Sequence, residues 1–192
     1  MSCHLIYPIS FYWHFRAPNA EEFIEAVENC HEPIDNDQFR WGKECVIDRV
    51  PLKWESWMSI VTPSLHEVAS QMNRIFGFVM YDPWINYYKR GYFQEVHDHA
   101  MQDLAMVFFA NDGEGFSKFC FTDRYSTSLR TEVKKLVGYQ NVRGIDYKAG
   151  DVIIFPGHLM HMVTPHQSDV TRKTFACNIQ LKDVCKPEVP PN

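Results

Sequence analysis

The sequence predicts a mainly β protein with the architecture of a jelly roll, in which two sheets pack face to face, with a few packing helices near the N-terminus. Aromatic residues make up 15% of the 192 residues, and aromatic side chains favour strands. From position 75 onward, short runs rich in β-branched and aromatic residues alternate with turn signals. About eight short strands with this punctuation are typical of a two-sheet barrel.

Turn signals that contain glycine or proline divide this region into runs with the strand pattern. Asp82-Pro83 and Asn111-Asp112-Gly113 are the clearest of these signals. The predicted strands are Phe76–Tyr81, Trp84–Lys89, Tyr92–His99, Leu104–Ala110, Ser117–Thr122, Val152–Phe155, Leu159–Thr164 and Thr171–Leu181.

The length favours a single domain, because 192 residues suffice for one sizeable core and are short for two. We expect a double-stranded β-helix core over 75–182 and a helical or irregular extension over 1–74 that packs on it. Asn19-Ala20-Glu21-Glu22 and Ser64-Leu65-His66-Glu67 each have the form of a capping box, which predicts a helix beginning at each. The segment 35–59, with tryptophans among charged residues and no clear period, could be a pair of strands or a loop that covers the substrate.

Composition excludes several classes of protein. The formal net charge is -5 and no long run of like charge occurs, so we expect no nucleic-acid partner. No apolar run reaches the length of a membrane span, and the first residues lack the basic region of a secretory signal. The six cysteines are scattered without a CxxC pair, which predicts free thiols in a cytoplasmic protein that has no membrane partner.

Three histidines are the strongest signal of chemistry. His97 and His99 stand two positions apart in a predicted strand, so their side chains point to one face while Asp98 points to the other. His161 comes from a second predicted strand, after the Pro156-Gly157 turn. Imidazoles that converge inside a barrel can hold a divalent metal ion and leave coordination positions open for an anionic ligand.

Arg172 adds a second functional group, eleven positions after His161. It opens a predicted strand in which it shares a face with Thr174 and Asn178. A cation that points into a barrel is costly unless an anion meets it, and a guanidinium can bind a carboxylate through two parallel hydrogen bonds. A metal together with Arg172 therefore predicts a ligand with a carboxylate at each end. The alternative is that Arg172 lies at the barrel edge and points to water.

These motifs, in this order, resemble the iron(II) and 2-oxoglutarate-dependent oxygenase superfamily. The resemblance extends roughly from Trp84 to Leu181. It is greatest to a branch of marine bacteria and their phages in which HxH replaces the usual HxD. It implies a dioxygenase that hydroxylates a small-molecule or peptide substrate, with iron(II) as metal and 2-oxoglutarate as cosubstrate.

The resemblance also implies roles for individual residues. Iron(II) would be bound by His97, His99 and His161, with His99 where the carboxylate ligand usually stands. Arg172 would pair with the far carboxylate of 2-oxoglutarate, and Asn86 is a weaker candidate for a hydrogen bond to the cosubstrate.

The HxH motif departs from the usual pattern of the superfamily. Two histidines and a carboxylate leave iron(II) with one net positive charge, whereas three histidines leave two. The choice of iron over another divalent metal therefore stays open. Glu95, which shares the inward parity of His97, and Asp103, four residues after His99, could each restore an acid to the site.

Two other classes of function fit parts of the pattern. Gly91 followed by His97 and His99, and Gly150 followed by Pro156, approximate the two cupin motifs. A cupin would be a metal-dependent isomerase or dioxygenase that needs no oxoacid, or a small-ligand binding module, and would not require a buried arginine. A non-catalytic interaction domain could keep the histidines as a structural zinc site, although such sites usually have four protein ligands, often cysteines.

Overall fold

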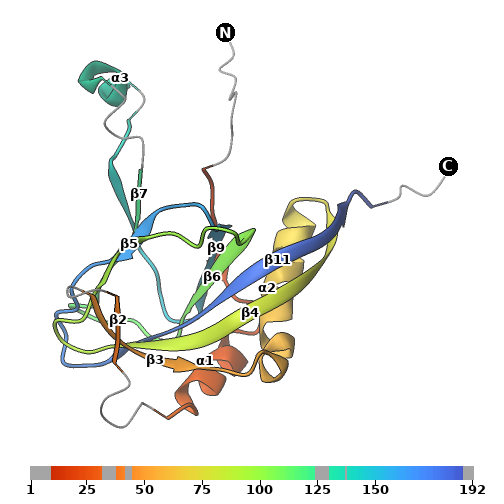
Figure 1. Cartoon of the computed structure of the whole chain (residues 1–192), viewed down its shortest axis with the longest axis horizontal. Coiled ribbons are helices and arrows are strands. Elements are labelled where there is room, and N and C mark those ends of the chain that lie inside the picture. The colour runs from red at the N-terminus through yellow and green to blue at the C-terminus, as the bar shows by residue number, and fades with distance from the viewer. Residues whose placement is uncertain (1–9, 32–37, 42–44, 124–129, 137, 188–192) are drawn as a thin grey trace.

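The computed structural model describes residues 10–31, 38–41, 45–123, 130–136 and 138–187. Two antiparallel sheets, one of seven strands and one of four, face each other (Figure 1). The prediction of a mainly β fold built from two sheets is confirmed. Among the described residues, no helix combines the length and the apolar character that a membrane span requires.

The larger sheet contains the longest strands. Its order is β1 (Trp13–Arg16), β9 (Asp151–Pro156), β6 (Leu104–Phe109), β11 (Arg172–Cys185), β4 (Ile75–Tyr88), β3 (Cys45–Pro51) and β2 (Gln38–Trp41). The smaller sheet has the order β5 (Gln94–His97), β10 (His161–Val163), β7 (Phe119–Thr122) and β8 (Val142–Ile145). The helices are α1 (Ala20–Glu28), η1 (Trp54–Ser56), α2 (Met58–Gln71) and α3 (Thr131–Leu136).

The central part of the larger sheet is buried on both faces. On the outer face, α1 and α2 pack against alternate residues of β6 and β11 (Figure 1). Phe23 of α1 stacks on Phe108 with ring centroids 3.9 Å apart, and Trp57 stacks on Phe175 at 4.8 Å. The intervening residues, such as Phe109, pack toward the smaller sheet. This alternation produces a second apolar core between the two sheets.

β4 is one continuous strand, whereas the sequence predicted two strands with a turn at Asp82-Pro83. Ala176 pairs with Trp84 and Asn178 with Tyr81, so Asp82 and Pro83 together lie opposite a single residue of β11. This is a β-bulge, which accommodates a proline because the bulged residue needs no ladder hydrogen bond. The turn signal therefore bends the strand instead of ending it.

Of the two helix starts predicted from capping boxes, one is correct and one is wrong. α1 follows Asn19 as predicted, although the Asn19 side chain bonds the backbone oxygen of Ile60 and makes no cap hydrogen bond. The prediction that a helix begins at Ser64 is wrong, because α2 begins at Met58 and Ser64 is buried inside it. Packing of the preceding Trp57 against the sheet core starts the helix earlier than the local signal indicates.

The first 74 residues contribute three strands to the larger sheet. β1, which was not predicted, pairs with β9, whereas β2 and β3 form the pair of strands that the sequence left open for the segment 35–59, and β3 also pairs with β4. Within the segment 35–59, the described part forms the β2–β3 pair and η1, while 35–37 and 42–44 lie outside the described residues. The β8 strand was not predicted either. The organisation as a single domain stays a prediction.

Candidate metal site

Three histidine side chains converge at one end of the smaller sheet. His97 ends β5, His99 lies two residues beyond it, and His161 begins β10, where its Cα pairs with that of His97. One ligand atom from each ring lies within 4.8 Å of the others. In the part of the chain that the structure describes, no other group of three potential metal ligands converges in this way. The predicted convergence is therefore present.

Backbone contacts set the orientation of two of these rings. Nδ1 of His97 donates to the Glu95 carbonyl at 2.8 Å, and Nδ1 of His161 donates to the Leu159 carbonyl at 2.9 Å. Because a carbonyl oxygen can only accept, the proton of each neutral ring lies on Nδ1. Each Nε2 then carries a lone pair that can bind a metal ion, and at His97 this lone pair accepts a hydrogen bond from the Gln94 side-chain amide at 3.0 Å.

Burial keeps the three rings neutral. It lowers the pKa of His97, lowers the pKa of His99 to about 4 with help from the neighbouring His97 and Arg49 charges, and lowers the pKa of His161 well below its usual value. A neutral imidazole is the form that binds a metal. The site is therefore ready to bind a divalent cation at neutral pH.

Arg172 begins β11 and is 1% exposed, so the alternative that it points to water is wrong. Its Nε donates to the Tyr147 hydroxyl at 2.7 Å, and the guanidinium lies over the rings of Tyr88 and Tyr147, 4.7 and 5.3 Å from their centroids. Nη1 and Nη2 are buried without a hydrogen-bond partner in the described structure. Because an unsatisfied buried cation is costly, this geometry fits an anionic ligand such as a carboxylate.

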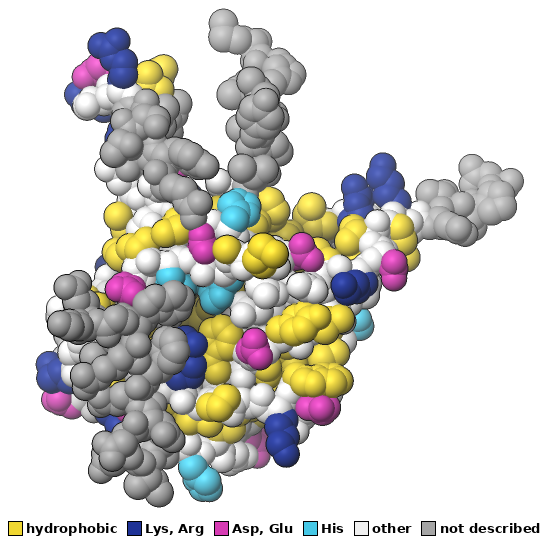
Figure 2. Space-filling view, in the orientation of Figure 1, with side chains coloured by type: hydrophobic (Ala, Val, Ile, Leu, Met, Phe, Trp, Pro, Cys, Tyr) yellow, Lys and Arg dark blue, Asp and Glu magenta, His cyan; other side chains and the backbone are white. Residues whose placement is uncertain are grey.

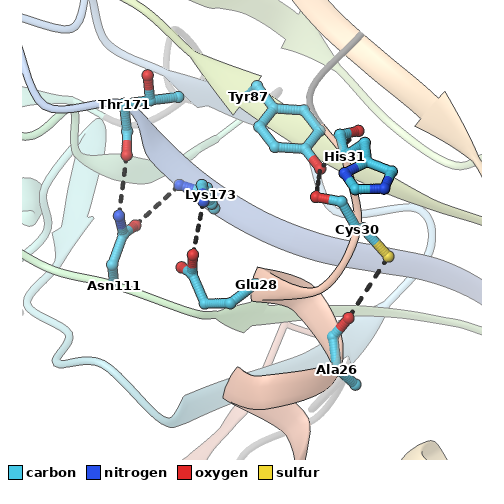
Figure 3. Close-up of polar contacts among 8 residues, drawn as sticks. All are labelled: Ala26, Glu28, Cys30, His31, Tyr87, Asn111, Thr171 and Lys173. Carbon is cyan, nitrogen blue, oxygen red and sulfur yellow. Dashed lines mark hydrogen bonds and ion pairs between the residues drawn. The ribbon is translucent and has the colours of Figure 1, made fainter.

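The residues directly before and after Arg172 in the chain, Thr171 and Lys173, are held by polar contacts (Figure 3). The Asn111 side chain donates to the Thr171 carbonyl and accepts from the Lys173 backbone nitrogen, both at 2.8 Å. The Lys173 ammonium pairs with Glu28 at the end of α1, at 2.6 Å. Since side chains alternate along a strand, an outward Lys173 places Arg172 inward.

A narrow cavity that opens to solvent connects the histidines to Arg172. Apolar residues such as Phe119 and Val163 form part of its wall. Asn86 also lines it, accepting from Nε of Arg49 and donating to the Thr174 hydroxyl, both at 3.4 Å. The histidine nitrogens lie at one end of the cavity and the Arg172 guanidinium lies at the other. This arrangement fits the predicted ligand, which has an acidic group at each end.

Neither acid that the sequence offered joins the histidines. A register shift between β5 and β10 places Gln94, not Glu95, in the cavity wall beside His97. The Asp103 carboxylate accepts from the Leu181 backbone nitrogen instead. Among the described residues, the site is therefore a set of three neutral ligands without a carboxylate.

Sequence reasoning missed four side chains around the cavity. The side chain of Gln94 could not be assigned to the inner face because the register shift in β5 changes the strand alternation there. Tyr147, which accepts a hydrogen bond from Arg172, lies in a loop whose sequence shows no periodicity. Tyr88 shares the strand parity of Asn86, so parity alone could have found it. Arg49 lies in the segment whose structure the sequence left open.

The family model of putative 2OG-Fe(II) oxygenases matches residues 82–178, a range that contains the three histidines and Arg172. No curated protein matches the sequence.

Several solved structures share the fold at low identity. An oxidoreductase of the 2OG-Fe(II) oxygenase family from Burkholderia pseudomallei is 11% identical, with 88% of this chain and 84% of the other covered and a TM-score of 0.62. HygX from Streptomyces hygroscopicus, solved with nickel, 2-oxoglutarate and hygromycin B bound, is 11% identical, with 90% and 83% covered and a TM-score of 0.61. A prolyl-4-hydroxylase from Pseudomonas putida is 10% identical, with 89% and 92% covered and a TM-score of 0.61. The predicted double-stranded β-helix is confirmed.

Proposed function

The chain belongs to the family of putative 2OG-Fe(II) oxygenases, and from this premise we propose that it is an iron(II) and 2-oxoglutarate-dependent dioxygenase that hydroxylates a small-molecule or peptide substrate. Iron(II) and 2-oxoglutarate are the cofactors of this family. Bound together with dioxygen, they supply the oxidising power that couples decarboxylation of 2-oxoglutarate to oxidation of a substrate.

His97, His99 and His161 are the proposed metal ligands. Two of them carry the ring proton on the nitrogen opposite Nε2 and therefore offer the Nε2 lone pair to the ion, which displaces the Gln94 amide at His97. The HxH motif, with histidine in place of a carboxylate, supports assignment to the HxH branch of the family. Three neutral ligands keep the full charge of the metal, which strengthens its attraction for the oxoacid end of the cosubstrate.

The observation that supports the proposal most strongly is the pair of unsatisfied Arg172 nitrogens in the cavity wall. Arg172 binds the far carboxylate of 2-oxoglutarate through these two donors, and Tyr147 and Tyr88 hold the guanidinium plane in place. Asn86 is placed to donate to the cosubstrate from the same wall. The apolar residues between the two ends exclude water from the reacting groups.

A cupin that uses no oxoacid was the main alternative. It gives no role to a buried arginine whose terminal nitrogens lack partners, and the family match does not favour it. A structural zinc site would need a fourth ligand, and the described residues bring together three. Both alternatives are therefore weaker than the oxygenase.

The test is consumption of 2-oxoglutarate by the iron(II)-loaded protein, measured as succinate formed in air. We expect slow formation of succinate even without substrate, and its loss in His97→Ala, His161→Ala and Arg172→Ala. His158→Ala is the matched control, because His158 is exposed and lies outside the cavity. Succinate formation at the wild-type rate by the Arg172 variant would contradict the assignment of that residue.

A further inference from the structure

Trp84 lines the cavity beside the three histidines and has no role in the proposed function so far. It lies on β4, its Cα pairs with that of Ala176 on β11, and its ring centroid is 6.1 Å from that of His99. Its side chain forms part of the wall of the narrow cavity that leads to Arg172. Trp84 is therefore at the metal end of this cavity, whereas Arg172 is at the other end.

The indole nitrogen of Trp84 has no hydrogen-bond partner among the described residues. The residue is 7% exposed and its Nε1 is buried. An indole N–H can only donate, and a buried donor without an acceptor is costly. Buried indoles usually find a partner for this reason. The unsatisfied donor therefore indicates an acceptor that a bound ligand supplies.

The residues beside Trp84 on the inner face of the larger sheet offer no acceptor. Pro51 and Ala176, which pair with it on the two neighbouring strands, have apolar side chains. The side-chain oxygen of Asn86, two positions along β4, already accepts a hydrogen bond from β3. The side-chain oxygen of Asn178 is itself buried without a partner, so it does not accept the indole hydrogen. The cavity is the direction that is left.

The Arg49 guanidinium makes the Trp84 indole a better donor. It lies over the ring, 4.5 Å from the centroid, and its Nε donates to the Asn86 side chain at 3.4 Å. A cation over an aromatic face attracts the ring electrons, which leaves the N–H more positive. The same contact holds the plane of the indole, so the donor is preorganised for its acceptor.

The position of this donor favours the cosubstrate over the substrate as the source of the acceptor. On the face of the molecule shown in Figure 2, histidine and basic side chains lie close together beside a hollow with a hydrophobic wall, where a substrate can approach from solvent. Nε1 of Trp84 is buried, in the wall of a narrow cavity that has to hold 2-oxoglutarate between the metal and Arg172. The carboxylate of 2-oxoglutarate that binds the metal through one oxygen has a second oxygen that requires a donor.

We propose that Trp84 donates its indole hydrogen to the carboxylate of 2-oxoglutarate that lies next to the metal. The inference rests on the proposed function and adds a cosubstrate-binding residue to it. Trp84 orients the oxoacid end of the cosubstrate, and Arg172 binds the far carboxylate. Because the indole is neutral, this hydrogen bond adds no charge beside the metal.

Nuclear magnetic resonance of the zinc-loaded full chain tests the contact, because zinc is diamagnetic and each of the five tryptophans gives one indole N–H signal. The Trp84 signal is identified by its loss in Trp84→Phe and by its proximity to the His99 ring in the wild type. We expect this signal to move downfield on addition of 2-oxoglutarate, and also of saturating pyruvate, which has the oxoacid end and no second carboxylate. A signal that stays in place while 2-oxoglutarate binds, or that moves with 2-oxoglutarate and not with pyruvate, would overturn the inference.

The affinity for 2-oxoglutarate provides a second readout. Trp84→Phe keeps an aromatic ring and loses the donor, so we expect it to bind 2-oxoglutarate about tenfold more weakly and zinc within about twofold of the wild type. Trp54→Phe is the matched control, since Trp54 is exposed and lies outside the cavity, and it should bind both ligands as the wild type does. Equal affinity for 2-oxoglutarate in the wild type and a folded Trp84→Phe would contradict the proposed contact.

Circular dichroism shows whether both variants fold. If Trp84→Phe does not fold, the wild-type spectra decide the outcome, with the Trp84 signal identified from the His99 ring alone. A wild type that holds zinc at the three histidines and does not bind 2-oxoglutarate would overturn the proposed function, and this inference with it.

Discussion

The Gln94 side-chain amide donates a hydrogen bond of 3.0 Å to Nε2 of His97, the nitrogen that the proposed metal would use. The direction follows from the other ring nitrogen, which donates to the Glu95 carbonyl. The Gln94 oxygen accepts from the Tyr88 hydroxyl at 3.0 Å, and the Tyr88 ring lies under Arg172. One buried amide thus links the surroundings of the metal to those of the cosubstrate.

We predict that Gln94→Leu raises the affinity for a divalent metal. The metal must displace the amide from His97, and a hydrogen bond of about 1 kcal/mol corresponds to roughly a fivefold change. Competition with a chromophoric chelator for zinc measures the effect. Weaker metal binding by Gln94→Leu would show that Gln94 supports the ligand set instead of competing with the metal.

Arg172→Met should have opposite effects on cosubstrate binding and on stability. Loss of two charge-assisted hydrogen bonds should weaken 2-oxoglutarate binding by about 100-fold or more. Calorimetry under anaerobic conditions measures this change in affinity. The metal-free variant should gain roughly 1 kcal/mol in free energy of unfolding, because two unpaired donors disappear while one bond to Tyr147 is lost. A strongly destabilised variant would mean that both donors have partners in solution.

Tyr147→Phe removes the hydroxyl that orients Arg172. The phenol accepts from Nε at 2.7 Å and donates to the Ser117 carbonyl at 3.1 Å, and the ring stacks on Phe109 with centroids 3.9 Å apart, so phenylalanine keeps the packing and loses both hydrogen bonds. We expect an increase of about fivefold in the Kd for 2-oxoglutarate and an unchanged Kd for the metal. Changed metal binding would argue against separate roles for the two ends of the cavity.

The metal-free protein should lose stability as the pH falls below neutral. The folded protein has lowered pKa values for His97, His99 and His161, whereas the unfolded chain takes up protons near the ordinary histidine value of about 6.5. The unfolded state then binds more protons, so the free energy of unfolding decreases from about pH 6.5 down to about 4, the folded pKa of His99.

Urea denaturation at a series of pH values measures this decrease. His99→Gln, which cannot titrate, should show a smaller decrease than the wild type over the same range. An identical pH dependence of the two proteins would contradict the neutral, buried state of His99.

The sequence predicted that three histidine rings meet. The two-residue step from His97 to His99 and the separate strand of His161 indicated this convergence, although His99 lies beyond the end of β5. Alternation failed for Glu95, because a register shift between β5 and β10 turned Gln94 inward instead. Bulges arise from pairing with a distant strand, and the local sequence of β5 does not encode that partner.

Features that depend on tertiary packing were also missed. The early start of α2 at Met58 and the pairing of β3 with β4 depend on contacts with distant strands, which override local signals. Arg49 could not be assigned a role because no period in its segment indicated a strand. The sheet order that brings it to the histidines is known only from the fold.

Binding of 2-oxoglutarate to the iron(II)-loaded protein under anaerobic conditions tests the central claim most directly. We predict binding in a ratio of one to one that requires the metal and is lost in both His161→Ala and Arg172→Met. A wild-type protein that holds iron at the three histidines and does not bind 2-oxoglutarate would contradict the account.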